Sequence, residues 1–387
     1  MKELSSRLSD VPFSAIRKIF DMCIGVEDLI KFTVGEPDFM TSDHIIEAAY
    51  QSMKAGEMKY TSNRGILELR QELSKYIREK KNVEANPETE IMVTNGGMQA
   101  LFMSMNAICN PGDEIIIGSP YFTNYLSQVM ICGAVPIFVQ LHEENNFIFK
   151  IEDLRDAITD KTKAILLNSP SNPLGSIIDS DTMQAIANLA IEKDLYIITD
   201  EVYQDYIYDE DVKFVSIASL EGMKERTIIV DSFSKSYCMT GWRVGYACAS
   251  ADIINLMVKQ QEAMASCVNA AAQFGALEAL RGPKEQYAEM IQIFKKRRDT
   301  FVEGIQRIDK LSCIKPKGAF YLFVNIKETG LTSEEFAVRL LNEGKVAVIP
   351  GDGFGIEGEG YVRISYVTTQ EDIEEGLRRI ERFIKSL

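Results

Sequence analysis

Short runs of consecutive apolar residues recur along the first two thirds of the chain, separated by polar or amphipathic stretches. A run that is apolar throughout is typical of a strand buried on both faces of a parallel sheet. The stretches between the runs repeat apolar residues every three or four positions, which indicates helices. The pattern therefore predicts an α/β fold. The predicted strands cover residues 91–94, 114–117, 134–139, 163–167, 195–198, 227–230 and 244–248.

The predicted helices each have one apolar face. In residues 65–80, Leu69, Leu73 and Ile77 recur at helical spacing. The helix at 179–193 starts at Asp179, a good N-cap residue. From residue 90 the order strand, helix, strand predicts a βαβ unit, and the other predicted helices cover residues 43–55 and 98–109 and a stretch that opens at 119–122.

The pattern changes after Ser250. One long helical stretch is predicted as far as Leu280, and Gly282-Pro283 breaks it. The chain has 387 residues, more than one hydrophobic core usually holds, so we expect a division at 1–42 (arm and part of a small domain), 43–282 (large domain) and 283–387 (small α+β domain). The later predicted elements are helices at 284–308, 333–341 and 371–385 and strands at 319–324, 346–349 and 361–366.

Composition narrows the function. The net charge of −15 argues against binding to nucleic acid or to an anionic membrane. No apolar run reaches membrane-spanning length, and the N-terminus lacks the apolar core of a signal peptide. Seven scattered cysteines without a Cys-x-x-Cys pair favour a reducing compartment, so we expect a cytoplasmic protein. With only two histidines, a histidine-based zinc site or a Ser-His-Asp triad is not expected, and we predict no metal.

The chemistry concentrates in residues 231–243. Lys235 follows the predicted strand at 227–230, and Ser232, Ser234 and Arg243 lie near it in sequence. A lysine shielded at the end of an inner strand can lose its proton and act as a nucleophile. Hydroxyls and an arginine suit a phosphate. This combination suggests pyridoxal phosphate held as a Schiff base, although an isolated Ser-x-x-Lys is more often an ordinary surface turn.

Other predicted strands also end in polar or glycine-rich residues. Gly96-Gly97 opens a helix, where bare amides favour a phosphate. Asp200 follows another strand and could keep a pyridine nitrogen protonated. Because ligands bind at the carboxyl ends of parallel strands, these residues are expected to meet. Each has an ordinary alternative, namely a plain turn for the glycines and a helix cap for the aspartate, but their joint occurrence is hard to explain in that way.

Together these motifs resemble those of the class I/II aminotransferases of PLP fold type I. The similarity runs nearly end to end, and the branch looks like the aspartate/aromatic aminotransferases. The segments 14–18 and 35–39 look closer to the aromatic-preferring members. The resemblance implies a large domain with a mostly parallel seven-stranded sheet between helices, and a smaller α+β domain built from both chain ends. The motifs occupy residues 168–175, 200–203, 232–235, 239–243 and 358–363.

The resemblance also implies roles for individual residues. Lys235 would bind the cofactor covalently and move the proton, and Asp200 would pair with the pyridine nitrogen. Arg363 would clamp the substrate carboxylate near Gly35 and Asn172, although by itself a structural ion pair is as good an explanation for this arginine. The remaining cofactor contacts would be Asn172 and Tyr203 (ring oxygen), Phe122 (ring face), Gly97, Met98, Ser232 and Arg243 (phosphate), Ser234 (phosphate, or only the shape of the turn), and Tyr60 from the partner subunit of a homodimer.

The implied activity is a ping-pong transfer of the α-amino group of an amino acid, an aromatic and/or aspartate-like donor, to a 2-oxo acid such as 2-oxoglutarate. One residue departs from the pattern. Some acidic-substrate members of the branch have a lysine where Met98 stands, so an aromatic or neutral donor gains weight over aspartate. Two alternatives stay open: a C–S β-lyase of the same fold, and a PLP-sensing regulator. Residues 353–358 also fit a dinucleotide-binding pattern, but they lead into a predicted strand rather than a helix.

Overall fold

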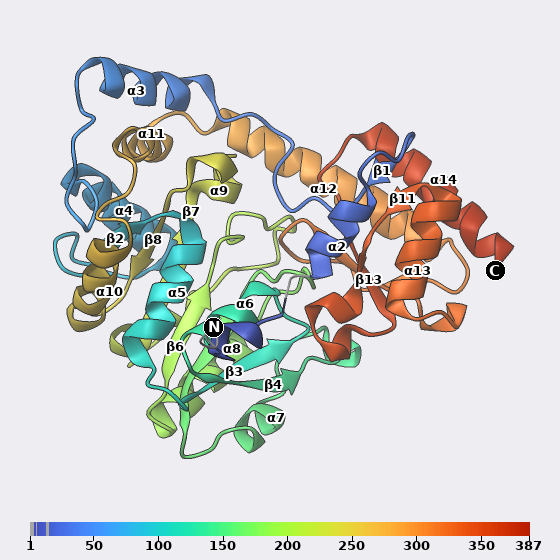
Figure 1. The fold of residues 1–387 in the computed structure, drawn as a ribbon, viewed down its shortest axis with the longest axis horizontal. Coiled ribbons are helices and arrows are strands. Elements are labelled where there is room, and N and C mark those ends of the chain that lie inside the picture. Colours follow the sequence, from blue (N-terminus) through green and yellow to red (C-terminus); the bar gives the residue numbers. More distant parts are fainter. Residues whose placement is uncertain (1–3, 5, 13–14) are drawn as a thin grey trace.

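A seven-stranded mixed sheet forms the larger part of the fold (Figure 1). The computed structural model describes residues 4, 6–12 and 15–387, so Ser14 of the segment 14–18 lies outside the described residues. Within the sheet, β8 alone runs opposite to the other strands. The strand order is β2 (Ile91–Thr94), β8 (Gly245–Cys248), β7 (Thr227–Ser232), β6 (Tyr196–Asp200), β5 (Thr162–Asn168), β3 (Glu114–Ser119) and β4 (Val135–Gln140).

Helices cover both faces of this sheet, because alternate residues of each strand point to opposite sides. Ile115 and Ile117 pack into the same core as the buried residues of α5 (Gly96–Ile108), α6 (Asn124–Ile131) and α10 (Ala251–Met264). Ile116, between them, packs with α8 (Ser180–Glu192) on the other side. Near β2 and β8, that second face is covered by α3 (Asp43–Lys54), α4 (Leu67–Lys81) and α11 (Ala270–Arg281).

A four-stranded antiparallel sheet lies in the C-terminal part of the chain, in the order β12 (Ile349–Pro350), β13 (Tyr361–Ser365), β10 (Tyr321–Asn325) and β9 (Ser312–Cys313). The N-terminal strand β1 (Ile30–Lys31) pairs with β11 (Val346–Ala347), so a segment from the first part of the chain lies beside one from the last part, blue against orange in Figure 1. The remaining helices are α1 (Ser6–Ser9), α2 (Ala15–Met22), α7 (Ile151–Asp156), α9 (Phe233–Ser236), α12 (Glu285–Gln306), α13 (Ser333–Arg339) and α14 (Gln370–Ser386).

Three details of the sequence interpretation were wrong. The stretch up to Leu280 is two helices, because residues 265–269 interrupt it and Asn269 caps α11. Residues 119–122 do not open a helix, since α6 begins at Asn124. The strand predicted at 346–349 is two short strands, because β11 pairs with β1 and β12 with β13. The order of the strands in the sheet was not predicted, and β2 and β3, which are close in the chain, lie far apart in it.

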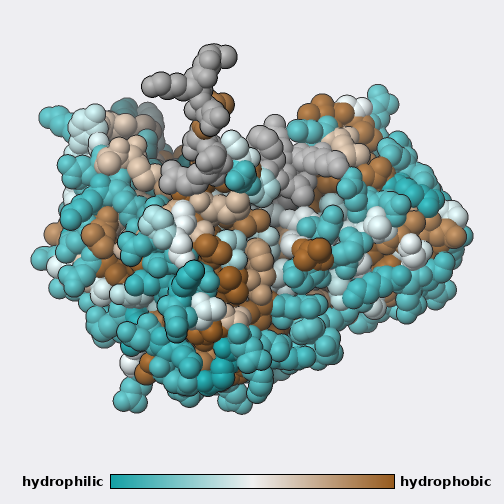
Figure 2. Space-filling view, turned by 60° about the horizontal axis from the view of Figure 1, so that its bottom comes forward, coloured by the Kyte–Doolittle hydropathy of each residue, from teal (hydrophilic) through white to brown (hydrophobic). Residues whose placement is uncertain are grey.

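The surface is hydrophilic over most of the face in Figure 2, with hydrophobic residues gathered in its middle. Within the described residues, no helix is both long enough and apolar enough to cross a membrane. The same part of the chain contains no group of three or more His, Cys, Asp or Glu side chains arranged to hold a metal ion.

Candidate active site

A cavity of about 260 Å³ lies where β5, β6 and β7 end and β13 approaches them. All but one of the site residues predicted from the sequence line it: Gly35, Gly97, Met98, Phe122, Asn172, Asp200, Tyr203, Ser232, Ser234, Lys235, Arg243 and Arg363. The exception is Tyr60, which is 89% exposed and lies outside the cavity. The lining also includes residues that the sequence did not single out, among them Phe20, Thr33, Tyr125, Asn168 and Tyr321.

Lys235 lies on the single-turn helix α9, directly after β7. The hydroxyl of Ser232 accepts a hydrogen bond from the Ser234 amide (2.9 Å) and so fixes the turn. The Tyr206 hydroxyl donates to the Lys235 carbonyl oxygen (2.7 Å), and the Lys235 amine donates to the Gly35 carbonyl oxygen (2.5 Å). Burial lowers the pKa of Lys235 to about 8, against the opposing effect of the Glu36 carboxylate. About a tenth of this amine is therefore uncharged at pH 7, far more than for a lysine with the ordinary pKa, and the neutral form is the nucleophile.

Asp200 ends β6 and is buried. The Tyr125 hydroxyl donates to one of its carboxylate oxygens (2.7 Å), and the Val202 amide donates to the other (3.3 Å). Burial raises the pKa of Asp200 to about 6, although these hydrogen bonds lower it. Among the described residues no cation forms an ion pair with this carboxylate. A buried acid of this kind would gain most from a positive charge placed in the cavity.

Glycines, serines and an arginine form another wall of the cavity. The amide of Gly97 belongs to the first turn of the 13-residue helix α5, where free amides attract anions. Gly96 has φ +77° and no side chain, and a Cβ there would collide with the Arg243 guanidinium. Arg243 itself donates to the Thr240 carbonyl oxygen (2.8 Å). With Ser232 and Ser234, this wall suits a phosphate.

Arg363 lies in the middle of β13 and is 2% exposed. Its guanidinium donates to the side-chain oxygen of Asn172 (3.0 Å) and to the carbonyl oxygen of Thr33 (2.9 Å). Its Nε atom is buried without a hydrogen-bond partner, and no carboxylate of the described residues pairs with it. Burial lowers the pKa of Arg363, because the guanidinium charge is shielded from water. A carboxylate ligand would satisfy both the charge and the free donor.

Hydrogen bonds connect further residues of the cavity around Lys235, Asp200 and Arg363. Asn168 donates to the Asp200 carbonyl oxygen (3.1 Å) and accepts from the Asn172 amide (2.8 Å). The hydroxyls of Tyr203 and Tyr321 are 3.0 Å apart. Asn168 lies within a motif that the sequence did reveal. Tyr125 and Tyr321 lie on α6 and β10, and no motif surrounds them, so sequence reasoning missed both.

These residues fit pyridoxal phosphate by their chemistry. The amine of Lys235 can bond to its aldehyde, Asp200 can pair with a protonated ring nitrogen, and the wall at Gly97 and Arg243 can hold its phosphate. The buried, unpartnered Nε of Arg363 leaves a donor for a second, carboxylate-bearing ligand in the same cavity. The donor set therefore matches a cofactor and an amino acid bound together.

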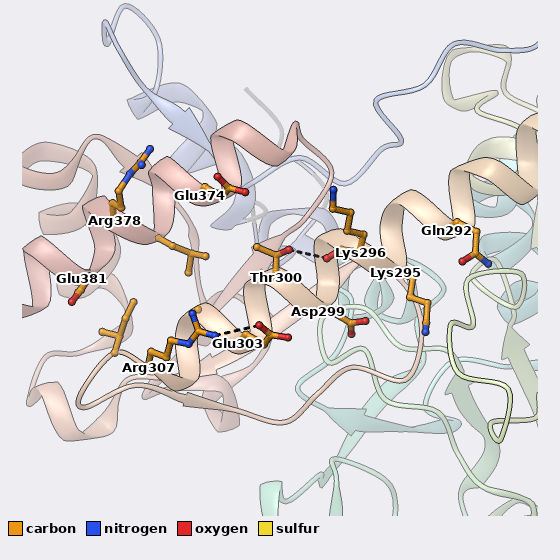
Figure 3. Close-up of a pocket in the computed structure, with 13 residues that line it drawn as sticks. Gln292, Lys295, Lys296, Asp299, Thr300, Glu303, Arg307, Glu374, Arg378 and Glu381 are labelled. Atoms are coloured by element: carbon orange, nitrogen blue, oxygen red, sulfur yellow. Dashed lines mark hydrogen bonds and ion pairs between the residues drawn. The ribbon is translucent and has the colours of Figure 1, made fainter.

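A larger cavity, of about 800 Å³, lies between α12 and α14 (Figure 3). Most of its lining is charged and open to solvent; the side chain of Arg307, for example, is 77% exposed and pairs with Glu303 at 3.4 Å. None of the site residues predicted from the sequence lines it. Exposed pairs of this kind contribute little energy and form on most protein surfaces.

Comparison with known proteins points to the same chemistry. The family described as aminotransferase class I and II matches residues 27–380. The aspartate aminotransferase of Pyrococcus abyssi is 44% identical to the chain, over 99% of the chain and 98% of that protein. The aromatic-amino-acid aminotransferase 2 of Thermococcus litoralis is 41% identical, also over 99% and 98%. The crystal structure of the aromatic aminotransferase from Pyrococcus horikoshii OT3 has a TM-score of 0.91 and 41% identity, and the match covers 96% of the chain and 99% of that structure.

The lyase and the regulator find no support in these comparisons, whereas aspartate and aromatic aminotransferases match over nearly the whole chain. The similarity confirms the predicted fold, enzyme class and cofactor. The chain belongs to the class I and II aminotransferases, in their aspartate/aromatic branch, and is a transaminase of fold type I that depends on pyridoxal phosphate.

Proposed function

We propose that the enzyme takes the amino group from an aromatic or other neutral amino acid and passes it to a 2-oxo acid such as 2-oxoglutarate, in two half-reactions at one site. The observation that carries this proposal is Arg363, a buried guanidinium with a free Nε donor and no carboxylate partner among the described residues. Both substrates contain a carboxylate next to the reacting carbon. One arginine can therefore bind each of them in turn.

The proposed roles of the residues follow from their surroundings. Pyridoxal phosphate, when bound, supplies an electron-withdrawing ring that accepts the electron pair left on the α-carbon. Lys235 takes the α-proton on its amine, since its lowered pKa of about 8 keeps part of the amine neutral. Asp200 holds the ring nitrogen in its charged form. The Gly97 and Met98 amides, Ser232, Ser234 and Arg243 hold the phosphate, Asn172 and Tyr203 hydrogen-bond the ring oxygen, and Phe122 packs on the ring.

Arg363 and the Gly35 backbone position the substrate carboxylate. Asn172 orients the arginine, because its side-chain oxygen accepts from the guanidinium (3.0 Å). The rings of Tyr321 and Phe354 lie 4.4 and 4.9 Å from the guanidinium carbon and exclude water from it. A bidentate pair of charge-assisted hydrogen bonds, made where water is excluded, fixes the substrate α-carbon beside Lys235.

The preference for a neutral donor rests on Met98. Its sulfur lies 3.6 Å from the Asn124 amide nitrogen, and Leu101 and Phe20 line the same cavity. On this side of the cavity, a thioether and two hydrocarbon side chains give a second substrate carboxylate no charged partner. They favour an aromatic ring, which gains from burial of its apolar area. The second carboxylate of 2-oxoglutarate would then be bound by another group, such as a residue of a partner subunit.

We also propose a cytoplasmic homodimer whose site is completed by Tyr60 of the partner subunit. Tyr60 is exposed, and on α3, which precedes it in the chain, Ile46, Tyr50 and Met53 are exposed as well. Their spacing places these three on one helix face, which a second copy could cover. The described cysteines form no disulfide bond, which suits the reducing cytoplasm. We retain the division into 1–42, 43–282 and 283–387 as the proposed domain boundaries.

A panel of amino donors tests the proposal. The holoenzyme is mixed with 2-oxoglutarate and with tyrosine, phenylalanine, alanine or aspartate, and glutamate formation is measured. We expect kcat/KM for phenylalanine to exceed that for aspartate by about tenfold or more, because one charged group without a partner costs at least 1.4 kcal/mol. Met98→Lys, which supplies a partner for a second carboxylate, is the matched variant and should shift the ratio toward aspartate. A wild-type preference for aspartate would contradict the donor assignment.

A further inference from the structure

A buried ion cluster lies directly behind the cavity, on the opposite face of the sheet. Lys81, the last residue of α4, has a fully buried side chain. Its amine lies 2.7 Å from a Glu201 carboxylate oxygen, 3.0 Å from an Asp231 carboxylate oxygen and 2.6 Å from the Gln204 side-chain oxygen. An ammonium group has three donors, and here each donor has an acceptor.

The two carboxylates are the chain neighbours of site residues. Glu201 follows Asp200, and Asp231 precedes Ser232. Because successive residues of a strand point to opposite faces, Asp200 and Ser232 face the cavity while Glu201 and Asp231 face Lys81. Lys81 therefore joins the back of β6 to the back of β7 at the level of the site.

The cluster lies at the point where β6 and β7 separate. The last paired residues of the two strands are Asp200 and Val230. One further backbone hydrogen bond follows, donated by the Glu201 amide to the Val230 carbonyl oxygen (2.9 Å). Beyond it β6 turns away, whereas β7 continues to Ser232 beside β8. Past this point, the bridge from Glu201 through Lys81 to Asp231 ties the two chain segments together.

We propose that Lys81 is a positioning residue of the reaction, which sets the placement of Asp200 relative to Ser232 and Lys235 by holding Glu201 and Asp231 together. The inference rests on the roles proposed above for Asp200 and Lys235. Lys81 does not touch the cavity, so it acts only through the two strands.

The surroundings of Lys81 keep its amine charged and connect the cluster to the site. Although burial lowers it, the Asp231 and Glu201 carboxylates hold the pKa of Lys81 above its ordinary value, so the amine stays charged. Asp231 also accepts from the Tyr246 hydroxyl (2.9 Å) and from the Ser232 amide (2.7 Å). The second of these bonds links the cluster directly to the phosphate wall. Removing Lys81 would leave two buried carboxylates side by side, and the chain segments that bear them would move apart.

The neighbouring Lys80 provides a matched control. Its side chain is 52% exposed and lies 3.8 Å from Asp205, outside the cluster. Lys81→Met and Lys80→Met remove the same charge from adjacent positions of one helix. Asp231→Asn keeps the size of the side chain and most of its hydrogen bonds, and so tests the cluster if Lys81→Met does not fold.

Two measurements distinguish a displaced Asp200 from a general loss of protein stability. The first is kcat per folded enzyme. The second is the affinity of the apoenzyme for pyridoxal phosphate, compared with that for an analogue with carbon in place of the ring nitrogen. Only the natural cofactor can pair with Asp200, so a displaced Asp200 lowers the ratio of the two affinities. A general loosening of the protein weakens both affinities and leaves their ratio unchanged.

We expect Lys81→Met to lower kcat by about 10- to 100-fold, the size typical of a site displaced from a distance. The affinity ratio should fall about tenfold, as for the loss of one charged hydrogen bond. Asp231→Asn should change both in the same direction by less, and Lys80→Met by less than about twofold. The inference is overturned if every folded variant of Lys81 and Asp231 matches Lys80→Met in both measurements.

Lys235→Ala and Asp200→Asn, measured in the same assays, distinguish a failure of the proposed function from a failure of the role of Lys81. If these variants retain turnover, the proposed function fails. If they lose turnover while Lys81→Met and Asp231→Asn keep both kcat and the affinity ratio, only the role of Lys81 fails.

Discussion

The two cavities of this protein differ in size and, more importantly, in whether their charged groups are exposed or buried. The cavity between α12 and α14 is about three times larger, with about 800 Å³ against about 260 Å³. Most of its charged side chains are open to solvent, and two of them, Arg307 and Glu303, form an exposed ion pair (Figure 3). In the smaller cavity, the buried Arg363 lacks an acidic partner and the buried Asp200 a cationic one among the described residues.

The comparison indicates that buried charges without a partner, rather than a large volume, identify the functional cavity. An exposed charge is solvated by water and needs no ligand. A buried charge without a partner costs free energy, and a protein keeps it only where a ligand completes it. The charges of the larger cavity are solvated by water, whereas Arg363 and Asp200 in the smaller cavity are buried and have no oppositely charged partner among the described residues.

The largest expected difference between the cavities is in their lysines. Lys235→Ala should lower kcat by about 10³-fold or more, since it removes the group that moves the proton. Lys296→Ala, in the larger cavity, should leave kcat within about twofold, because an exposed charge is screened. Steady-state rates with phenylalanine and 2-oxoglutarate measure both. Equal losses in the two variants would remove the distinction between the cavities.

The arginines give the second contrast. Arg363→Lys keeps the charge but loses the planar fork, and kcat/KM should fall by about 10- to 100-fold. The fall should be the same for every amino donor, since Arg363 contacts the carboxylate that they share. Arg307→Lys should have no measurable effect. A fall confined to one donor would place Arg363 at the side-chain end of the substrate instead.

The third contrast is in stability. Burial raises the pKa of Asp200 from 3.8 to about 6, so between these values the native apoprotein binds more protons than the unfolded chain. Its stability therefore falls as pH rises through this window, and the full cost, about 3 kcal/mol, is present above pH 6. Asp200→Asn removes that cost.

Urea unfolding of the two apoproteins measures this effect. At pH 7.5, Asp200→Asn should be more stable than the wild type by up to about 3 kcal/mol, and near pH 4 the difference should vanish. Glu303→Gln, with an exposed side chain in the larger cavity, should change stability by less than about 0.5 kcal/mol at either pH. A wild-type protein that is the more stable one at pH 7.5 would refute the account of Asp200.

The smallest expected effect concerns Tyr60. In a homodimer with a shared site, Tyr60→Phe should weaken cofactor binding by about tenfold, as for one hydrogen bond to a phosphate. Mixing Tyr60→Phe with Lys235→Ala subunits creates hybrid dimers with one intact site, so full-strength binding at that site should reappear. If mixing restores nothing, Tyr60 does not act across the subunits.

Sequence alone gave much of this arrangement. Buried parallel strands are apolar throughout, so the strands before Asp200 and Lys235 could be located, and their polar ends had to meet at one edge of the sheet. What the sequence could not give was the strand order, because β2 and β3 are close in the chain but far apart in the sheet. Partners from distant elements were also missed, because no local pattern links Tyr125 to Asp200 or Lys81 to Asp231.

The most direct test of the central claim is the position of the covalent bond to the cofactor. The holoenzyme is treated with borohydride, which makes the link between lysine and cofactor permanent, and the modified peptide is identified by mass spectrometry. We predict the label on Lys235 alone. A label on Lys295 or Lys296 in the larger cavity, or on any other lysine with Lys235 unmodified, would contradict the account.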